Sequence, residues 1–295
     1  MMQAPDDWWQ REAVCLRLRD WFEHHIVGLH VGYLYNGEPH DRVFSGFLLK
    51  HRGLALWVTA AHVIDRINEL INNPKLTLDH AGWMDRSPGP AAGPIPVSLP
   101  DLVMGALERD GIDVGFVAIN PLLLASFEAN PNVRFCDPGI WLGHDAANPE
   151  GYYVLGYPKE WIEPTGKFKE KDGQLRRTIR MGVACLPVTP IEDQGTAANP
   201  PVGSPFWGSE YCMYAQLRPY SDSKQNLVEN IDGMSGGPVL SVERSTEGRL
   251  KYRLFGIQSA WQAGPRIVKA TRVAVLDALV DHIANTVEAA ASELE

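Results

Sequence analysis

Residues 231–240, with the sequence IDGMSGGPVL, place Ser235 among three glycines. Glycine adopts backbone angles that other residues resist, so this run is compatible with an ordinary loop. The same glycines also let the chain curl tightly enough to aim several N–H groups at one point, as a serine nucleophile requires for its oxyanion. The run matches the G-x-S-x-G pattern of a nucleophile elbow. Taken alone, Ser235 is compatible with a turn and with a nucleophile.

A serine hydroxyl becomes a good nucleophile when a base removes its proton, usually a histidine held by a carboxylate. His62 stands out because it ends the apolar run WVTAAHVI, where Ala60 and Ala61 leave room around the imidazole. Asp113 enters the apolar run of GIDVGFVAI, where an unpaired charge would cost on the order of several kcal/mol. Singly, each has an ordinary structural interpretation, His62 as a core or surface histidine and Asp113 as a turn residue after Gly111.

The three segments together are more specific than any one of them. TAAH, DVGFVAI and GMSGGP, in this order, resemble the motif blocks of the trypsin-like (chymotrypsin-fold) serine peptidases, of a bacterial type without disulfides or a signal peptide. The resemblance implies that Ser235 attacks the scissile carbonyl, that His62 acts as general base and then general acid, and that Asp113 orients His62. It also implies an oxyanion hole formed by the backbone N–H groups of Gly233 and Ser235.

The same resemblance suggests residues that bind substrate. Glu229, six residues before the serine, corresponds to the floor of the primary specificity pocket, and Ser259 and Trp261 lie on a strand beside it. A carboxylate at the floor favours cleavage after Lys or Arg, whereas the bulk of Trp261 narrows the pocket. Surface exposure for Glu229 and core packing for Trp261 are the alternatives. Met234 stands where activation-dependent relatives carry an aspartate, so we expect no maturation through a freed N-terminus.

From residue 26 onward, short β-branched and aromatic runs alternate with turn residues, which is typical of antiparallel strands. The resemblance implies an all-β fold of two antiparallel six-stranded β-barrels of chymotrypsin type, with the active cleft between them. Both ends of this segment carry helical patterns. We therefore expect an N-terminal helical extension over 1–25, a peptidase domain over 26–272 and a C-terminal helix over 273–295.

The spacing of apolar residues in the two end segments predicts which side of each helix is buried. For the N-terminal helix the expected buried residues include Trp9, Val14, Leu16 and Trp21. For the C-terminal helix they are Val273, Leu276, Val280, Ile283 and Val287.

The composition is that of an ordinary globular protein, with 45% hydrophobic and 21% charged residues. A formal net charge of −9 argues against nucleic acid or an anionic membrane as a partner. The N-terminus lacks the apolar stretch of a signal peptide, and the four cysteines lack C-x-x-C spacing, which fits a cytoplasmic protein. No spacing typical of metal ligands or of a phosphate loop stands out, so we expect neither metal nor cofactor.

Two other functions stay open. An α/β-hydrolase-type esterase also uses G-x-S-x-G, but its Asp and His follow the serine, and here His282 is the only later histidine. A catalytically silent trypsin-fold binding scaffold would retain the fold without turnover. For a peptidase we expect protein or peptide substrates. Because an uncontrolled cytoplasmic protease is harmful, we also expect narrow specificity or regulation, for example by a protein partner.

Overall fold

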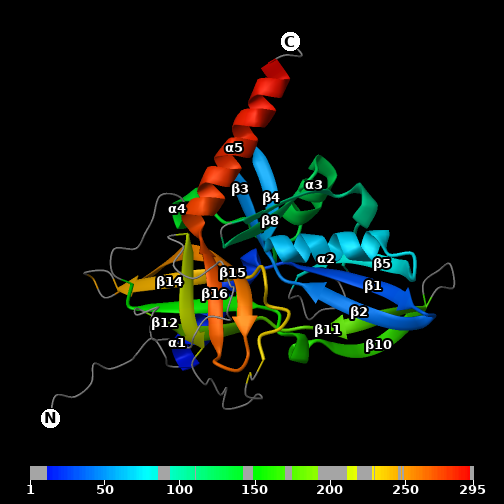
Figure 1. Cartoon of the computed structure of the whole chain (residues 1–295), viewed down its shortest axis with the longest axis horizontal. Coiled ribbons are helices and arrows are strands. Elements are labelled where there is room, and N and C mark those ends of the chain that lie inside the picture. The colour runs from blue at the N-terminus through cyan, green and yellow to red at the C-terminus, as the bar shows by residue number, and fades with distance from the viewer. Residues whose placement is uncertain are drawn as a thin grey trace.

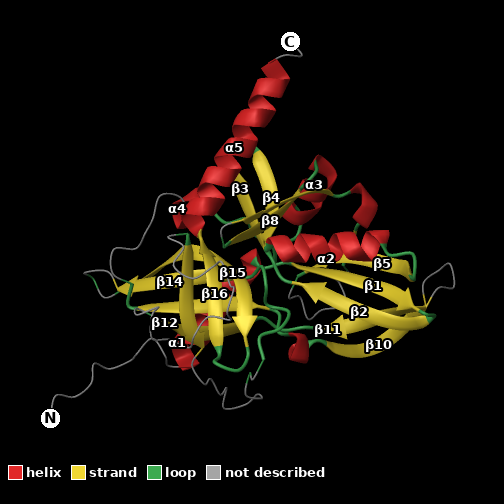
Figure 2. Cartoon of the chain, in the orientation of Figure 1, coloured by secondary structure: helices red, strands yellow, loops and turns green. Residues whose placement is uncertain are grey.

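The structure is a computed structural model of the whole chain. It describes residues 12–85, 94–109, 111–141, 149–169, 175–191, 211–217, 228, 230–244, 247 and 249–292. Two β-rich halves lie side by side, with helices at their periphery (Figures 1 and 2).

Strands make up most of the regular structure, and the α-helices lie near the two ends of the chain, within the first half and in the connection between the two halves. The α-helices are α1 (Glu12–Phe22), α2 (Ala61–Asn72), α3 (Pro121–Glu128), α4 (Pro138–Trp141) and α5 (Val273–Ser292). The 3₁₀ helices are η2 (Glu23–His25), η3 (Leu99–Asp101) and η4 (Lys159–Trp161). The strands before α3 are β1 (Gly28–Tyr35), β2 (Glu38–Phe44), β3 (Phe47–His51), β4 (Leu54–Thr59), β5 (Leu76–Met84), β6 (Ile95–Pro96), β7 (Val103–Arg109) and β8 (Ile112–Ala118). The later strands are β9 (Gly151–Gly156), β10 (Glu163–Lys169), β11 (Leu175–Arg180), β12 (Ala184–Pro190), β13 (Cys212–Leu217), β14 (Pro238–Arg244), β15 (Leu250–Gln262) and β16 (Ile267–Arg272).

The C-terminal half is a closed antiparallel barrel in the order β12-β13-β16-β15-β14-β9. Its strands carry runs of buried apolar side chains, such as Tyr153, Val154 and Leu155 on β9 and Val239 and Leu240 on β14. Closure leaves this sheet without an edge, which removes the unpaired backbone groups that edge strands expose. One of the two predicted six-stranded barrels is therefore confirmed.

The N-terminal half contains two four-stranded sheets, in the orders β2-β1-β5-β6 and β3-β4-β8-β7. They enclose one core, in which Leu29 of β1, Trp57 of β4, Trp83 of β5 and Val117 of β8 are all buried. β2 and β3 are separated by only two residues, so they form one bent strand shared between the sheets. The sequence of pairings β5-β1-β2/β3-β4-β8-β7 would close into a six-stranded ring if β5 paired with β7.

Among the described strands, however, β5 pairs with β1 and β6, and no β5–β7 pairing occurs. The expectation of a second closed barrel is thus not met in this half, because the two-residue strand β6 occupies the edge of β5. Every pairing between named strands is antiparallel. This topology also contradicts the α/β-hydrolase alternative, whose sheet is mainly parallel.

A helix is present at each end, as expected. The described part of the N-terminal helix, α1, buries Cys15, Leu18 and Phe22 in the core of the barrel half, and Trp21 is 37% exposed. The predicted buried face was therefore wrong for Trp21, and Trp9 lies outside the described residues.

Helix α5 leaves β16 directly, packs on β15 and β16, and extends away from the two halves (Figure 1). Its first turns bury Leu276 and Val280 as predicted, but Val287 near its far end is 52% exposed. Within the described part of the chain, no helix has the length and apolar character needed to cross a membrane.

Candidate active site

His62 lies where a buried strand turns into a helix. Strand β4 ends at Thr59, Ala60 has the extended backbone of an N-cap residue, and α2 starts at Ala61. Ala60 and Ala61 are fully buried, whereas 40% of the His62 side chain is exposed. The small alanines thus allow the helix to start against the core while the imidazole reaches the surface.

Asp113 contacts both the imidazole and the backbone of His62. Its Oδ2 lies 2.8 Å from Nδ1 of His62, and its Oδ1 accepts a 3.1 Å hydrogen bond from the His62 backbone N–H. Asp113 is 8% exposed, and its own backbone N–H donates to Oγ1 of Thr271 in the barrel half. A carboxylate at Nδ1 favours the proton on that nitrogen, which leaves Nε2 with a lone pair that accepts protons.

The loop that carries Ser235 consists of two consecutive β-turns. The Met234 N–H donates to the carbonyl of Ile231 at 3.0 Å, and the Gly237 N–H donates to the carbonyl of Met234 at 2.8 Å. The third residue of each turn has positive φ, +93° at Gly233 and +90° at Gly236. Both angles match the position of a type II turn where glycine avoids the steric cost of a Cβ. Ser235 is therefore the second residue of the second turn and is half-buried.

This loop is fixed to both halves of the molecule. On the barrel side, the Gly236 N–H donates to the carbonyl of Gln258 at 2.8 Å. On the other side, Oγ of the fully buried Ser45 donates to the carbonyl of Gly233 at 2.6 Å and accepts from the Tyr157 N–H at 2.9 Å. The loop thus lies against the bend between β2 and β3.

Gly236 shows how closely the loop approaches the strand that leads to His62. A Cβ atom on Gly236 would collide with Oγ1 of Thr59 and would lie 2.5 Å from the carbonyl oxygen of Ser45. Thr59 itself donates from Oγ1 to that carbonyl at 2.8 Å. Ser235 is therefore next to a residue that touches the end of β4, and His62 follows Thr59 by three positions. Within the described residues, no hydrogen bond joins the Ser235 hydroxyl to His62.

Two backbone N–H groups of the loop have no backbone acceptor among the described residues. In the described part of the chain, the N–H groups of Met234, Gly236 and Gly237 donate to backbone carbonyls, whereas those of Gly233 and Ser235 have no such acceptor. These are the two donors predicted for an oxyanion hole. Met234 between them is fully buried in the barrel core and contacts Gly156, so its side chain anchors the loop through apolar packing.

A cavity of about 370 Å³ adjoins the His62–Asp113 pair. Trp261, Tyr214 and Lys269 from the barrel half contribute to its lining. Burial, followed by the proximity of Cys212, raises the pKa of Tyr214, so its hydroxyl stays protonated at neutral pH. The cavity therefore combines aromatic rings with a hydroxyl donor and with charged side chains of both signs, Lys269 and Glu108.

The predicted pocket residues have different outcomes. Trp261 lines the cavity, and the guanidinium of Arg266 lies 5.9 Å from its ring centroid. Ser259 is 2% exposed, its hydroxyl donates to the carbonyl of Lys269, and it is not among the residues that line this cavity. Glu229 lies outside the described residues.

Sequence reasoning missed several residues that build the site. Ser45 and Thr271 connect the two halves next to Ser235 and Asp113, yet each is a single hydroxyl residue in a strand region and matches no motif. A buried serine in the apolar run VFSGFLL was the available signal for Ser45. Sequence reasoning also missed a group of potential metal ligands, namely His30, Asp41 and His80, which come together from three strands of the N-terminal half.

No protein-family model matches this chain, and no curated protein matches it. Similar solved structures include the tobacco vein mottling virus protease, with 10% identity over 85% of this chain and 77% of that one and a TM-score of 0.38. The Rv3671c protease from M. tuberculosis in its active form has 13% identity over 89% and 82%, with a TM-score of 0.41. A structure of GrC has 14% identity over 88% and 94%, with a TM-score of 0.46. All three TM-scores are below 0.5, so the description of the fold depends on the strand pairings of the chain itself.

Proposed function

We propose that this chain is a serine endopeptidase with a chymotrypsin-type arrangement of its two β-rich halves, and that residues 26–272 form its peptidase domain. The nucleophile is Ser235, the general base is His62, and Asp113 holds the base. The observation that carries the proposal is the 2.8 Å contact between Nδ1 of His62 and Oδ2 of Asp113. That contact gives the buried carboxylate a partner and directs the proton-accepting nitrogen of His62 away from it.

In the first half of the reaction, Oγ of Ser235 forms a bond to the carbonyl carbon of the scissile peptide. Nε2 of His62 takes the hydroxyl proton, and the negative charge on the substrate oxygen is stabilised by the N–H groups of Gly233 and Ser235. The C–N bond then breaks, the leaving amine takes the proton from His62, and the substrate acyl group stays on Ser235 as an ester.

In the second half, a water molecule attacks the ester while His62 takes one of its protons. The C–O bond to Ser235 breaks, and His62 returns the proton to the serine oxygen. Asp113 stays ionised throughout and stabilises the imidazolium that forms twice per cycle. At the end of the cycle His62 and Ser235 are back in their starting protonation states, and water has supplied the only atoms added to the products.

The way in which the loop is held supports this proposal. An oxyanion hole is effective when its donors are fixed before the reaction, because no energy is then spent on orienting them. Hydrogen bonds from Ser45 and to Gln258, together with the buried Met234 side chain, fix the loop on three sides. The substrates we propose are proteins or peptides that extend along the cavity beside Trp261.

Labelling with a fluorophosphonate tests the proposal directly, because this reagent reacts with activated serines. We expect one adduct, located on Ser235 by peptide mass spectrometry, and none in Ser235→Ala. Ser126→Ala is the matched control, because its hydroxyl only donates to the carbonyl of Leu122 within α3, and it should be labelled like the wild type.

A second variant separates activation by His62 from simple exposure of the serine. Asp113→Asn should lower the turnover of a peptide substrate by about 10⁴-fold, because an amide does not hold His62 in the tautomer that accepts a proton at Nε2. Labelling that persists in Ser235→Ala would contradict the assignment of the nucleophile. A folded wild-type protein that is not labelled at all would favour the silent scaffold.

A further inference from the structure

A second group of histidine and carboxylate side chains lies away from the proposed active site, on the sheet β2-β1-β5. Along β1, Leu29 and Val31 face the core, so His30 and Gly32 face the opposite side of the sheet. Gly32 pairs with Asp41 of β2 on one side and with His80 of β5 on the other. The register therefore places His30, Asp41 and His80 on the same face of three adjacent strands.

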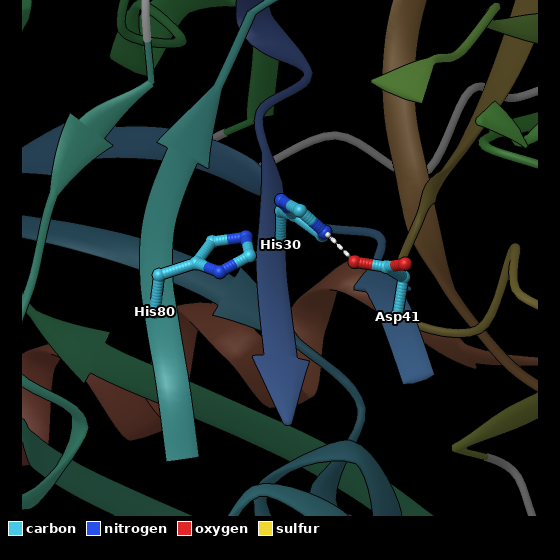
Figure 3. A group of neighbouring side chains, drawn as sticks. All are labelled: His30, Asp41 and His80. Carbon is cyan, nitrogen blue, oxygen red and sulfur yellow. Dashed lines mark hydrogen bonds and ion pairs between the residues drawn. The ribbon is translucent and has the colours of Figure 1, made fainter. Parts of the chain in front are cut away.

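Figure 3 shows these three side chains converging, with His30 between the other two. Nε2 of His30 lies 3.0 Å from Oδ1 of Asp41, and the imidazole rings of His30 and His80 have centroids 4.8 Å apart. One potential ligand atom from each residue lies within 4.8 Å of those of the other two. The ring of His80 covers Gly32, where any side chain would occupy the same space.

The group is largely shielded from water. The exposed fractions of the side chains are 3% for His30, 11% for Asp41 and 12% for His80. Electrostatic interactions are stronger in such surroundings, and buried charges are normally paired or bound to metals. The hydrogen bond to His30 provides one partner for Asp41. It does not explain why the His80 ring also lies beside these two side chains.

His80 is oriented by a carboxylate outside the group. Its Nδ1 lies 3.0 Å from Oδ2 of Asp79, so the proton is favoured on Nδ1 and Nε2 carries a lone pair. No described residue forms a hydrogen bond with Nε2 of His80, and in Figure 3 one ring nitrogen of His80 points toward His30. A histidine whose other nitrogen is bound by a carboxylate is the common arrangement of metal ligands, because the carboxylate fixes the tautomer and increases the basicity of the free nitrogen.

We propose that His30, Asp41 and His80 form a zinc-binding site. Two imidazole nitrogens and one carboxylate oxygen are a typical three-residue ligand set for Zn²⁺, whereas Ca²⁺ and Mg²⁺ prefer six or more oxygens. Zinc binds such ligands at about 2.0–2.2 Å, which places tetrahedral ligand atoms roughly 3.4 Å apart. Zinc binding therefore moves Nε2 of His30 and Oδ1 of Asp41 slightly apart from their 3.0 Å contact, while the His80 nitrogen, which lies within 4.8 Å of both, closes the remaining gap. When zinc binds, the Nε2 proton of His30 is exchanged through solvent to Nδ1, so the ring stays neutral and Nε2 binds the metal, and a water molecule takes the fourth position.

Such a site would tie together three strands of the N-terminal half without taking part in peptide hydrolysis. β1 and β2 are joined by a short turn, but β5 is separated from them in sequence by β3, β4 and α2. A metal shared by the three strands therefore adds a long-range connection. Because zinc binds the folded chain alone, it should raise the melting temperature.

The test uses the full-length protein after removal of metals with EDTA. Titration with ZnCl₂ in a calorimeter should give one tight site per chain, and Co²⁺ in place of zinc should give the visible absorption of a four-coordinate site with nitrogen and oxygen ligands. Asp79→Asn should lower the zinc affinity by about 10–100-fold, as expected for a residue that orients a ligand. His80→Ala and Asp41→Asn should lower it by more than that.

His40→Ala is the matched control, because His40 is next to Asp41 on β2 but stacks on Tyr33 instead of joining the group. It should bind zinc like the wild type. Circular dichroism in EDTA establishes whether each variant is folded, and the cobalt spectrum of the wild type tests the site without any variant. Absence of a stoichiometric site in the wild type, or equal zinc affinity in wild type, His80→Ala and Asp41→Asn, would overturn the proposal.

Discussion

Substitution of Gly236 by alanine tests whether the Ser235 loop packs closely against the N-terminal half. The backbone of Gly236 has φ of +90°, and a Cβ atom there would collide with Oγ1 of Thr59. It would also lie 2.5 Å from the carbonyl oxygen of Ser45, which is backbone and cannot rotate away. The variant therefore has to shift the loop away from β4.

The destabilisation expected for Gly236→Ala has two parts. A Cβ at positive φ costs roughly 1–2 kcal/mol. Forcing extra volume into a packed site costs a further amount of about 1–3 kcal/mol. Together they predict that Gly236→Ala lowers the free energy of unfolding by roughly 2–5 kcal/mol. Displacement of the loop should also slow fluorophosphonate labelling of Ser235, because the nucleophile moves relative to His62.

Gly37→Ala is the matched control for the backbone part. Gly37 lies in the turn between β1 and β2 with φ of +81°, and a Cβ there would meet nothing within 4 Å. The Gly37→Ala variant should lose about 1–2 kcal/mol of its free energy of unfolding, and Ser235 in it should be labelled at the wild-type rate. Urea denaturation, monitored by tryptophan fluorescence, measures the free energy of unfolding of both variants. Equal destabilisation of Gly236→Ala and Gly37→Ala would refute the close packing of the loop against Ser45 and Thr59.

Two further predictions concern buried polar residues. Burial lowers the pKa of His25 from 6.5 to about 4. As the pH falls, the unfolded chain therefore binds a proton at this residue before the folded chain does. The free energy of unfolding should decrease by up to about 3 kcal/mol between pH 7 and pH 4. His25→Gln should flatten this part of the stability–pH curve in urea titrations, and an unchanged slope would contradict the assignment. Ser45→Ala leaves the carbonyl of Gly233 and the N–H of Tyr157 without their partner, so it should lower the free energy of unfolding by about 1–3 kcal/mol for each. Urea denaturation measures this loss, and a stability equal to that of Ser126→Ala would argue against the bridging role of Ser45.

The local features of the chain could be predicted from the sequence. The hairpin turn at Asn36–Gly37, with φ of +52° and +81°, follows from residue types that tolerate positive φ. The first turns of α5 bury Leu276 and Val280 because their spacing matches a helix that covers an apolar surface. His62 and Asp113 stand out in the sequence without knowledge of their contact, because a charge in an apolar strand needs a partner.

Helix α1 shows that such patterns do not predict which face of a helix is buried. Its apolar residues permit more than one buried face, and the observed face, with Cys15, Leu18 and Phe22 inward, is selected by the barrel core on which the helix lies. Trp21 is consequently at the edge of this contact, where its ring packs on Tyr252 at a centroid distance of 3.6 Å. Periodicity thus indicated that a helix forms but not how it is rotated about its axis.

The sequence by itself determined the residue types of the proposed active site and most of the turns and strands that carry them. Only the tertiary structure decided which distant strands pair, and so which side chains meet. The pairing of Gly32 with both Asp41 and His80 creates the proposed zinc site, and the bend at Ser45 supports the Ser235 loop. A strand pattern reports which of its faces is apolar, whereas register and sheet order depend on packing among segments far apart in the chain.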